Sequence, residues 1–149
     1  MIEHAAANVY QQIGFPVIVK ATDKSEAGII TYPGWGAGFF VVDIDKQHGG
    51  LDEYKRLSKT IDFPKTVTAR TQRGGLHLYY RYPPNVTIPW RVDTTSGIDI
   101  LSDDATTHMP PSLGRLSGKR YYWIYSPQTT PMANPSTSLL TYIGAIPNE

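Results

Sequence analysis

Runs of apolar residues alternate with polar residues along most of this chain, and the period of the alternation changes from one segment to the next. Between residues 4 and 13 the apolar side chains recur every three or four positions, which predicts an amphipathic helix, and Gly14 is a typical helix end. The same spacing predicts a second helix over residues 51–59. Short runs rich in β-branched and aromatic residues predict strands at residues 15–19, 28–32, 39–45, 66–71, 76–82, 97–101 and 121–125.

Glycine and proline residues mark the connections between these elements. The glycine-rich segment 33–38 predicts a turn, and we expect it to join strands 28–32 and 39–45 as a hairpin. Residues 72–75 predict a second hairpin, formed by the two strands that flank them. Loops or rigid turns are expected at residues 20–26, 85–96, 102–109 and 110–112.

The apolar strand predicted at residues 39–45 carries two acids at its end, Asp43 and Asp45. Successive side chains of a strand alternate between its faces, so both acids lie on one face with their Cα atoms about 6.5 Å apart. Two carboxylates this close repel each other unless a cation lies between them. The pair therefore suggests a site for one or two divalent cations, although an Asp-x-Asp sequence is also common in surface turns.

Two other predicted strands carry one polar residue each on an otherwise apolar framework. His77 lies on strand 76–82, and Asp99 lies on strand 97–101 on the face opposite its isoleucines. If these strands are neighbours of the acidic strand, the polar side chains gather on one face of a sheet. Carboxylate oxygens are the ligands that Mg²⁺ and Mn²⁺ prefer, and a histidine beside them suits a triphosphate. Taken singly, His77 is more typical of a core histidine, and Asp99 is compatible with a turn cap.

The composition limits the classes of function. The 149 residues suffice for one domain, and the absence of cysteine excludes thiolate metal sites and cysteine nucleophiles. The net charge of +1 gives no general attraction to nucleic acid, so any such binding must come from local basic patches. The sequence shows no leader pattern and no apolar run of membrane-spanning length, so we expect a soluble, cytoplasmic protein without membrane contact.

The composition changes near the C-terminal end. Residues 126–149 are rich in proline, serine and threonine, which is typical of a tail or the start of a linker. We therefore expect one folded domain at residues 1–125, followed by this segment, with a short closing element at residues 138–143.

Six short motifs follow one another in an order that resembles a known family. They are Phe-Val-Val-Asp-Ile-Asp (40–45), Gly-Gly (49–50), Thr-x-Arg-Gly-Gly-x-His-x-Tyr (71–79), Gly-Ile-Asp-Ile (97–100), Pro-Pro-Ser (110–112) and Gly-x-x-Tyr-x-Trp (118–123). Together they resemble the bifunctional DNA primase/polymerase domain of the archaeo-eukaryotic primase superfamily, which is common in phage and plasmid replication proteins. The resemblance covers roughly residues 5–125.

The resemblance implies a fold, a site and a reaction. The fold would be an α/β (α+β) primase core, with a catalytic sheet like that of an RNA-recognition domain and a small N-terminal α/β unit. Asp43, Asp45 and Asp99 would be catalytic residues that bind Mg²⁺ or Mn²⁺, and His77 would contact the phosphates of the incoming nucleotide. The reaction would be template-directed transfer of NTPs or dNTPs on single-stranded DNA, in phage or plasmid replication, with a helicase domain or helicase partner in the same replication protein.

Four further residues are weaker candidates. Arg73, in the predicted hairpin turn, could reach a triphosphate or be a solvated arginine, and Ser112 could donate to a phosphate or hold a turn. Lys119 and Arg120 could contact template phosphates, although a solvated loop is the more common setting for such residues. Two other classes stay open at this point, a metal-dependent nuclease that uses the same acids and a nucleic-acid-binding module without catalysis.

Overall fold

The computed structural model describes residues 2–20, 28–93, 95–114 and 117–149 of the chain. Its helices are α1 (Ile2–Gln12), α2 (Gly50–Leu57) and α3 (Thr137–Ile143), with short 3₁₀ turns η1 (Trp35–Ala37) and η2 (Lys46–His48). Its strands are β1 (Ile18–Lys20), β2 (Gly28–Thr31), β3 (Phe39–Ile44), β4 (Thr68–Arg70), β5 (Leu76–Arg81), β6 (Val86–Thr87), β7 (Ile98–Leu101), β8 (Thr107–Met109), β9 (Tyr122–Tyr125) and β10 (Ile146–Pro147). The predicted loop at residues 20–26 lies almost wholly outside the described residues.

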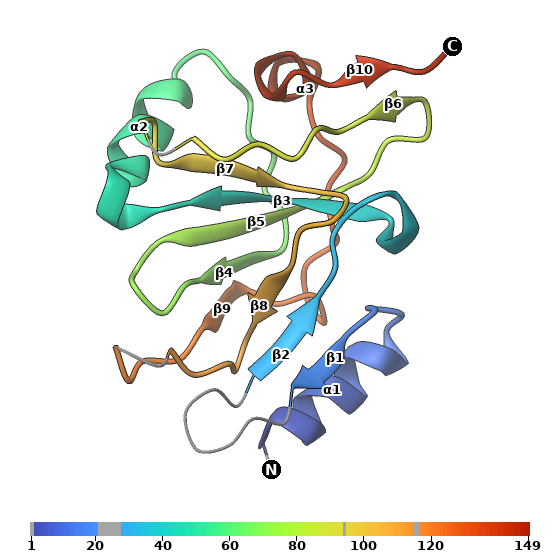
Figure 1. Cartoon of the computed structure of the whole chain (residues 1–149), viewed down its shortest axis with the longest axis vertical. Coiled ribbons are helices and arrows are strands. Elements are labelled where there is room, and N and C mark those ends of the chain that lie inside the picture. Colours follow the sequence, from blue (N-terminus) through green and yellow to red (C-terminus); the bar gives the residue numbers. More distant parts are fainter. Residues whose placement is uncertain (1, 21–27, 94, 115–116) are drawn as a thin grey trace.

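A five-stranded sheet forms the centre of the molecule, with the strand order β7-β3-β5-β4-β9 (Figure 1). All of its neighbouring strands run antiparallel. A second sheet has the order β1-β2-β8, and β10 pairs with β6 at the end of the molecule opposite α1. The predicted hairpin of residues 66–82 is confirmed, because β4 and β5 pair with each other.

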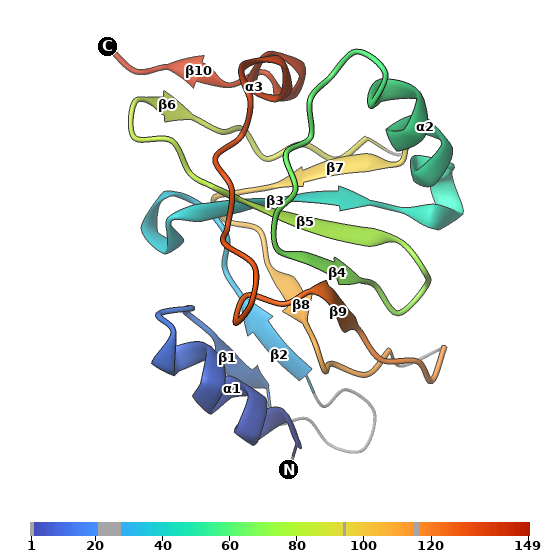
Figure 2. The ribbon, with the colours of Figure 1, turned by 180° about the vertical axis from the view of Figure 1, so that it is seen from behind.

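The alternation of side chains along β3 divides the core into two clusters. Phe40, Val42 and Ile44 are fully buried on one face of the central sheet, where α2 and α3 cover them. Phe39 and Val41 are buried on the other face, among residues of α1 and of the second sheet. Figure 2 shows α1 and β1 beside the lower part of this arrangement, far from α3. Both faces of β3 are therefore covered along most of its length, which explains its continuous apolar run.

The N-terminal unit is joined to the sheet by buried polar contacts as well as apolar packing. The Tyr10 hydroxyl of α1 donates to the Pro110 carbonyl at 2.5 Å and accepts from Trp123 Nε1 of β9 at 2.9 Å. The Tyr10 and Trp123 rings meet edge to face, with centroids 6.0 Å apart. α1, predicted from the apolar spacing of residues 4–13, therefore packs as an amphipathic helix on the sheet.

The hairpin expected between residues 28–32 and 39–45 is wrong. β2 pairs with β1 on one side and with β8 on the other, and segment 33–38 carries the chain across to the central sheet. Ile29 of β2 is fully buried and aligns with Met109 of β8, so β2 gains its core contacts from a strand far away in the sequence. The loop expected at residues 102–109 is also wrong in part, since β8 lies within it.

The C-terminal segment carries a short helix, α3, at the place of the expected closing element, and this helix packs on the core. Leu139 and Ile143 of α3 are buried against the central sheet. The Ser136 side chain accepts a hydrogen bond from Leu139 N at the start of this helix, and Gly144 ends it in a left-handed conformation. Proline, serine and threonine therefore supply caps and turns here, and the two apolar residues of one helical face anchor the segment.

The predicted fold class is confirmed. The chain is a mixed α and β domain with antiparallel sheets and a small N-terminal unit of α1, β1 and β2. Within the described ranges, no helix is both long enough and apolar enough to cross a membrane.

Candidate active site

Three polar residues form a row across the central sheet. In the antiparallel register Asp43 of β3 lies opposite Asp99 of β7 and opposite His77 of β5. Directly opposed residues in such strands have Cα atoms about 5 Å apart, so all three side chains lie on one face as immediate neighbours. The period-two alternation that predicted this gathering therefore agrees with the structure.

His77 is held from both sides of its ring. Its Nε2 atom lies 3.2 Å from Asp43 Oδ1, and its Nδ1 atom lies 3.3 Å from the Thr107 hydroxyl of β8. The His77 side chain is only 6% exposed, whereas that of Asp43 is 26% exposed. The ring is therefore fixed in the core, and its Nε2 edge faces the solvent-accessible carboxylate.

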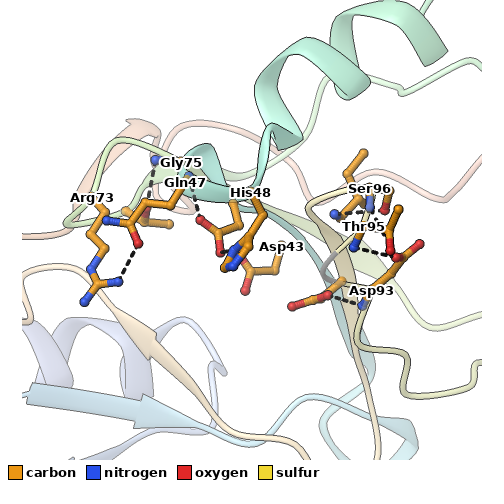
Figure 3. A network of polar contacts seen from close by, with 12 residues as sticks. Asp43, Gln47, His48, Arg73, Gly75, Asp93, Thr95 and Ser96 are labelled. Carbon is orange, nitrogen blue, oxygen red and sulfur yellow. Dashed lines mark hydrogen bonds and ion pairs between the residues drawn. The ribbon is translucent and has the colours of Figure 1, made fainter.

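Asp45 follows the end of β3 and caps the η2 turn. Its Oδ1 atom accepts from Gln47 N at 2.9 Å, and its Oδ2 atom lies 2.5 Å from His48 Nδ1. Figure 3 shows this network, with Asp43 between Gln47 and Arg73 on one side and the Asp93 turn on the other. The second acid of the pair is thus engaged by its own turn and not by its neighbour Asp43.

The backbone around Asp45 is closely packed. Asp45 N donates to the Gly97 carbonyl at 2.7 Å, and Gly50 N donates to the Asp45 carbonyl at 2.8 Å. A Cβ atom added at Gly50 would lie 2.3 Å from the Gly97 carbonyl oxygen, closer than real contacts allow. Only glycine fits at position 50, so the Gly-Gly motif joins the start of α2 to the ends of β3 and β7.

Asp99 is in an unfavourable place for a charge. Its Oδ1 atom accepts from Asp93 N at 2.6 Å. Partial burial raises the pKa of Asp99 above its ordinary value, and the negative charges of Asp43 and Asp45 raise it further, against the opposing effect of the Asp93 hydrogen bond. The negative charges of Asp43 and Asp45 therefore disfavour the ionised form of Asp99.

Asp43 and Asp99 share a face of the sheet and Asp45 lies beyond the end of β3, so the three carboxylates do not converge. Among the described residues, no group of three or more His, Asp or Glu side chains is arranged to hold a metal ion. The three side chains are carboxylates, the ligands that Mg²⁺ and Mn²⁺ prefer. A cation bound among them would reduce the repulsion between their negative charges. Asp43, Asp45 and Asp99 are the residues that could hold one, provided that Asp45 turns away from His48.

Arg73 lies at the margin of the acidic row. Its guanidinium donates to Gln47 Oε1 at 2.7 Å, and Gln47 N in turn donates to Asp45. The Arg73 side chain is exposed and can reach outward from this position. The hairpin turn therefore places the Arg73 guanidinium two hydrogen bonds away from Asp45, through Gln47.

Ser112 and Arg120 are not placed at the acidic row. Ser112 is fully buried, where its hydroxyl accepts from Ile29 N at 2.9 Å and donates to the Met109 carbonyl at 2.6 Å. Arg120 donates to the buried Glu3 carboxylate at 3.1 Å and to the Pro111 carbonyl at 2.7 Å. The geometry of Ser112 favours the turn-holding alternative, and Arg120 is bound to Glu3 and Pro111 instead of lying in a solvated loop.

Lys119 is exposed and lines an open cavity of about 490 Å³ together with Arg73. It therefore lies near the hairpin turn but not in the row of acids and histidine.

Two residues that lie against His77, Thr107 and Tyr121, were not among the predicted site residues. Thr107 comes from a polar segment that we expected to be a loop, and its register on β8 is set by distant partners. The Tyr121 ring lies 5.8 Å from the His77 ring, and burial and the charge of Asp43 raise the Tyr121 pKa. Tyr121 could have been found through the Gly-x-x-Tyr-x-Trp motif, which places it just before an aromatic strand.

Comparison with known proteins identifies the class. The family model described as bifunctional DNA primase/polymerase, N-terminal, matches residues 6–137 of the 149-residue chain. The chain belongs to this family, which indicates a DNA primase or polymerase activity, that is, an enzyme of nucleotidyl transfer. None of the curated proteins compared with the chain matches it.

Proposed function

We propose that this protein catalyses template-directed nucleotidyl transfer on single-stranded DNA, as primer synthesis, primer extension or both. The observation that supports this best is the row of Asp99, Asp43 and His77 across β7, β3 and β5. In a member of the primase/polymerase family, such a row combines cation ligands with a group suited to phosphate. The row lies on the face of β3 where the apolar positions give way to acids.

The three acids are the proposed ligands of Mg²⁺ or Mn²⁺. When bound, such ions activate a primer 3′-hydroxyl and neutralise the charge of the triphosphate. Asp43 is the central residue, because it has Asp99 on one side and His77 on the other. Asp45 takes part by giving up its contact with His48 for a contact with the cation. The His48 side chain is 49% exposed, so it can turn into water.

His77 and Arg73 are the proposed contacts to the phosphates of an NTP or dNTP. The Nε2 edge of His77 faces the Asp43 carboxylate, so a phosphate bound beside Asp43 comes within its reach. The Thr107 hydroxyl fixes the ring through Nδ1. Arg73 adds a mobile positive charge from the hairpin turn when it releases Gln47. We further place the reaction in phage or plasmid replication beside a helicase, as the family resemblance suggests.

The test is a primer assay with purified protein. Single-stranded DNA, labelled nucleotides and either Mg²⁺ or Mn²⁺ are incubated with and without an annealed primer. We expect cation-dependent products that are lost in Asp43→Ala/Asp45→Ala, because removal of two carboxylates leaves too few ligands. Asp62→Asn is the matched control, since Asp62 is an exposed acid on the loop after α2, and it should retain full activity.

The outcomes separate the classes of function. Products without a primer identify a primase, and products only with a primer identify a polymerase. Cation-dependent shortening of the DNA without added nucleotides would indicate the nuclease alternative. Full extension by the double variant, with a melting temperature equal to that of the wild type, would refute the assignment of the acids.

A further inference from the structure

The edge strand of the central sheet exposes apolar side chains that the acidic row does not use. β9 lies at the edge of the sheet beside β4 (Figure 2). Three of its residues are strongly exposed: Tyr122 at 57%, Ile124 at 38% and Tyr125 at 40%. Trp123 points the other way, into the contact with Tyr10. An edge strand with exposed aromatic residues is unusual unless something binds there.

A basic cavity lies at the start of this strand. It has a volume of about 490 Å³, and Tyr122 forms part of its lining. Its basic lining residues are Lys46, Arg70, Arg73, Lys119 and Arg120. Of the described residues that line it, none is Asp or Glu. Arg120 is paired with Glu3, so the other four cations give the cavity its positive charge. Such a lining is suited to an anion.

A second cavity continues from the first along the strand. It has a volume of about 390 Å³ and shares Arg70 with the basic cavity. Ile124, Tyr125 and Lys65 line it, and the Lys65 ammonium lies 4.4 Å from the centre of the Tyr125 ring. The two cavities meet at Arg70 and together present cations and aromatic rings beside β9, and we call them the β9 track.

The β9 track connects with the acidic row through the hairpin turn. Arg73 and Gln47 line the basic cavity, and Gln47 N donates to Asp45. β9 lies three strand positions from β3, a distance of about 14 Å. Arg70 and Tyr122 lie on the face of the sheet opposite His77, because Ala69 aligns with both His77 and Trp123. A chain-like ligand that reaches the acids can therefore occupy the track as well only by passing around the hairpin turn.

We propose that the β9 track binds the single-stranded DNA template, with unpaired bases stacked on Tyr122 and Tyr125 and phosphates bound by Arg70 and Lys119. A positive groove with aromatic platforms is the arrangement that binds single strands without sequence preference. A protein strand could pair with the exposed edge, but it would not account for four cations in a cavity whose described lining includes no Asp or Glu. The inference rests on the proposed function, because it takes the DNA to be the template of that reaction.

The test measures binding apart from chemistry. Fluorescence anisotropy of a labelled oligothymidylate gives Kd over a range of salt concentrations, without nucleotides or divalent cations. Tyr122→Ala should raise Kd about 5- to 150-fold through the loss of one stacking platform, whereas Tyr122→Phe should stay close to wild type. Lys119→Gln should lower the slope of log Kd against log salt by about 0.7, the value for one lost phosphate contact on a single strand.

Two controls make the result specific. Tyr32→Ala removes a tyrosine of similar exposure, 52%, beside a cavity lined by Asp103 and Asp104, and should leave Kd unchanged. Asp43→Ala/Asp45→Ala should keep DNA binding while it loses extension. If it does so and Tyr122→Ala weakens binding, the track is supported even where the wild type extends no primer, a result that would count against the proposed function alone.

Other outcomes would overturn the track. Unchanged Kd values for Tyr122→Ala and Lys119→Gln would place the DNA elsewhere, and so would a wild type without affinity for single strands. Equal loss of affinity for a duplex in Tyr122→Ala would exclude base stacking. A dimer in solution that Tyr122→Ala dissociates would identify the edge as a protein interface.

Discussion

Replacement of His77 by phenylalanine separates a catalytic role from a core role. Phenylalanine keeps an aromatic ring in the buried site and removes both ring nitrogens. The substitution removes the hydrogen bond between the Thr107 hydroxyl and the ring. Thr107 is only 3% exposed, and its hydroxyl keeps a single 3.5 Å contact to the His108 carbonyl. One under-satisfied buried hydroxyl costs about 1–3 kcal/mol, and Asp43 can be solvated because it is partly exposed. We therefore expect the melting temperature to fall by about 2–12 °C.

The expected effect on catalysis is larger than the effect on folding. A charge-assisted hydrogen bond to phosphate contributes about 1.5–3 kcal/mol, so kcat/KM for the nucleotide should fall about 10- to 150-fold in His77→Phe. The assay is the initial rate of primer extension against nucleotide concentration, well below the melting temperature of each variant. Thr107→Val is the matched control, because it breaks the same internal hydrogen bond but keeps the imidazole, and it should lose much less activity.

Comparison of the two variants decides the role of His77. If His77→Phe and Thr107→Val have equal extension rates at equal folded fraction, His77 is a core histidine and the proposed phosphate contact is wrong.

Three further predictions concern stability. Because the pKa of Asp99 is raised above its ordinary 3.8, its ionisation opposes folding. Asp99→Asn should therefore melt at a higher temperature than the wild type at pH 7 without divalent cations, and the gain should vanish as the pH falls below that ordinary value. An equal gain at all pH values would contradict this reasoning. Leu139→Ala should lower stability by about 2–5 kcal/mol in denaturant titrations, whereas the exposed Thr141→Ala should have little effect, and equal losses would mean that α3 is not anchored by its apolar face. Arg120→Ala should lower the melting temperature, since it removes the ion-pair partner of the buried Glu3, and it should change the Kd for single-stranded DNA little; the opposite pattern would make Arg120 a template contact.

The alternation of apolar and polar residues predicted the central part of the fold correctly. On β3 the apolar run is long enough, and its alternation regular enough, to assign both faces and to place Asp43 with the residues of one of them. The β4–β5 hairpin was also predicted, because its turn lies between two strands that pair with each other. Local patterns are sufficient where the partner of a strand is its neighbour in sequence.

The pattern failed where partners are distant. β2 carries the same local signal as a hairpin strand, yet it lies between β1 and β8, and β8 has the polar sequence Thr-His-Met. Nothing in either segment specifies this register, which depends on the packing of the N-terminal unit. The site shows the same division: Asp43, Asp99 and His77 lie on the predicted strands, whereas Asp45 lies beyond the end of β3 and Thr107 was missed because it reaches the histidine from β8.

Because Gly50 packs closely on the Gly97 carbonyl, a substitution at position 50 can destroy the geometry of the site without any change to an acid. Any side chain at position 50 would force apart the ends of β3 and β7, and with them the carboxylates of Asp45 and Asp99. A relative with every carboxylate intact but a larger residue at this position would retain the apparent signature of an enzyme and lack its geometry. The presence of all the acids is therefore not sufficient to predict activity in such sequences. Gly50, which lies between Asp45 and Asp99 in the sequence, belongs to the same motif.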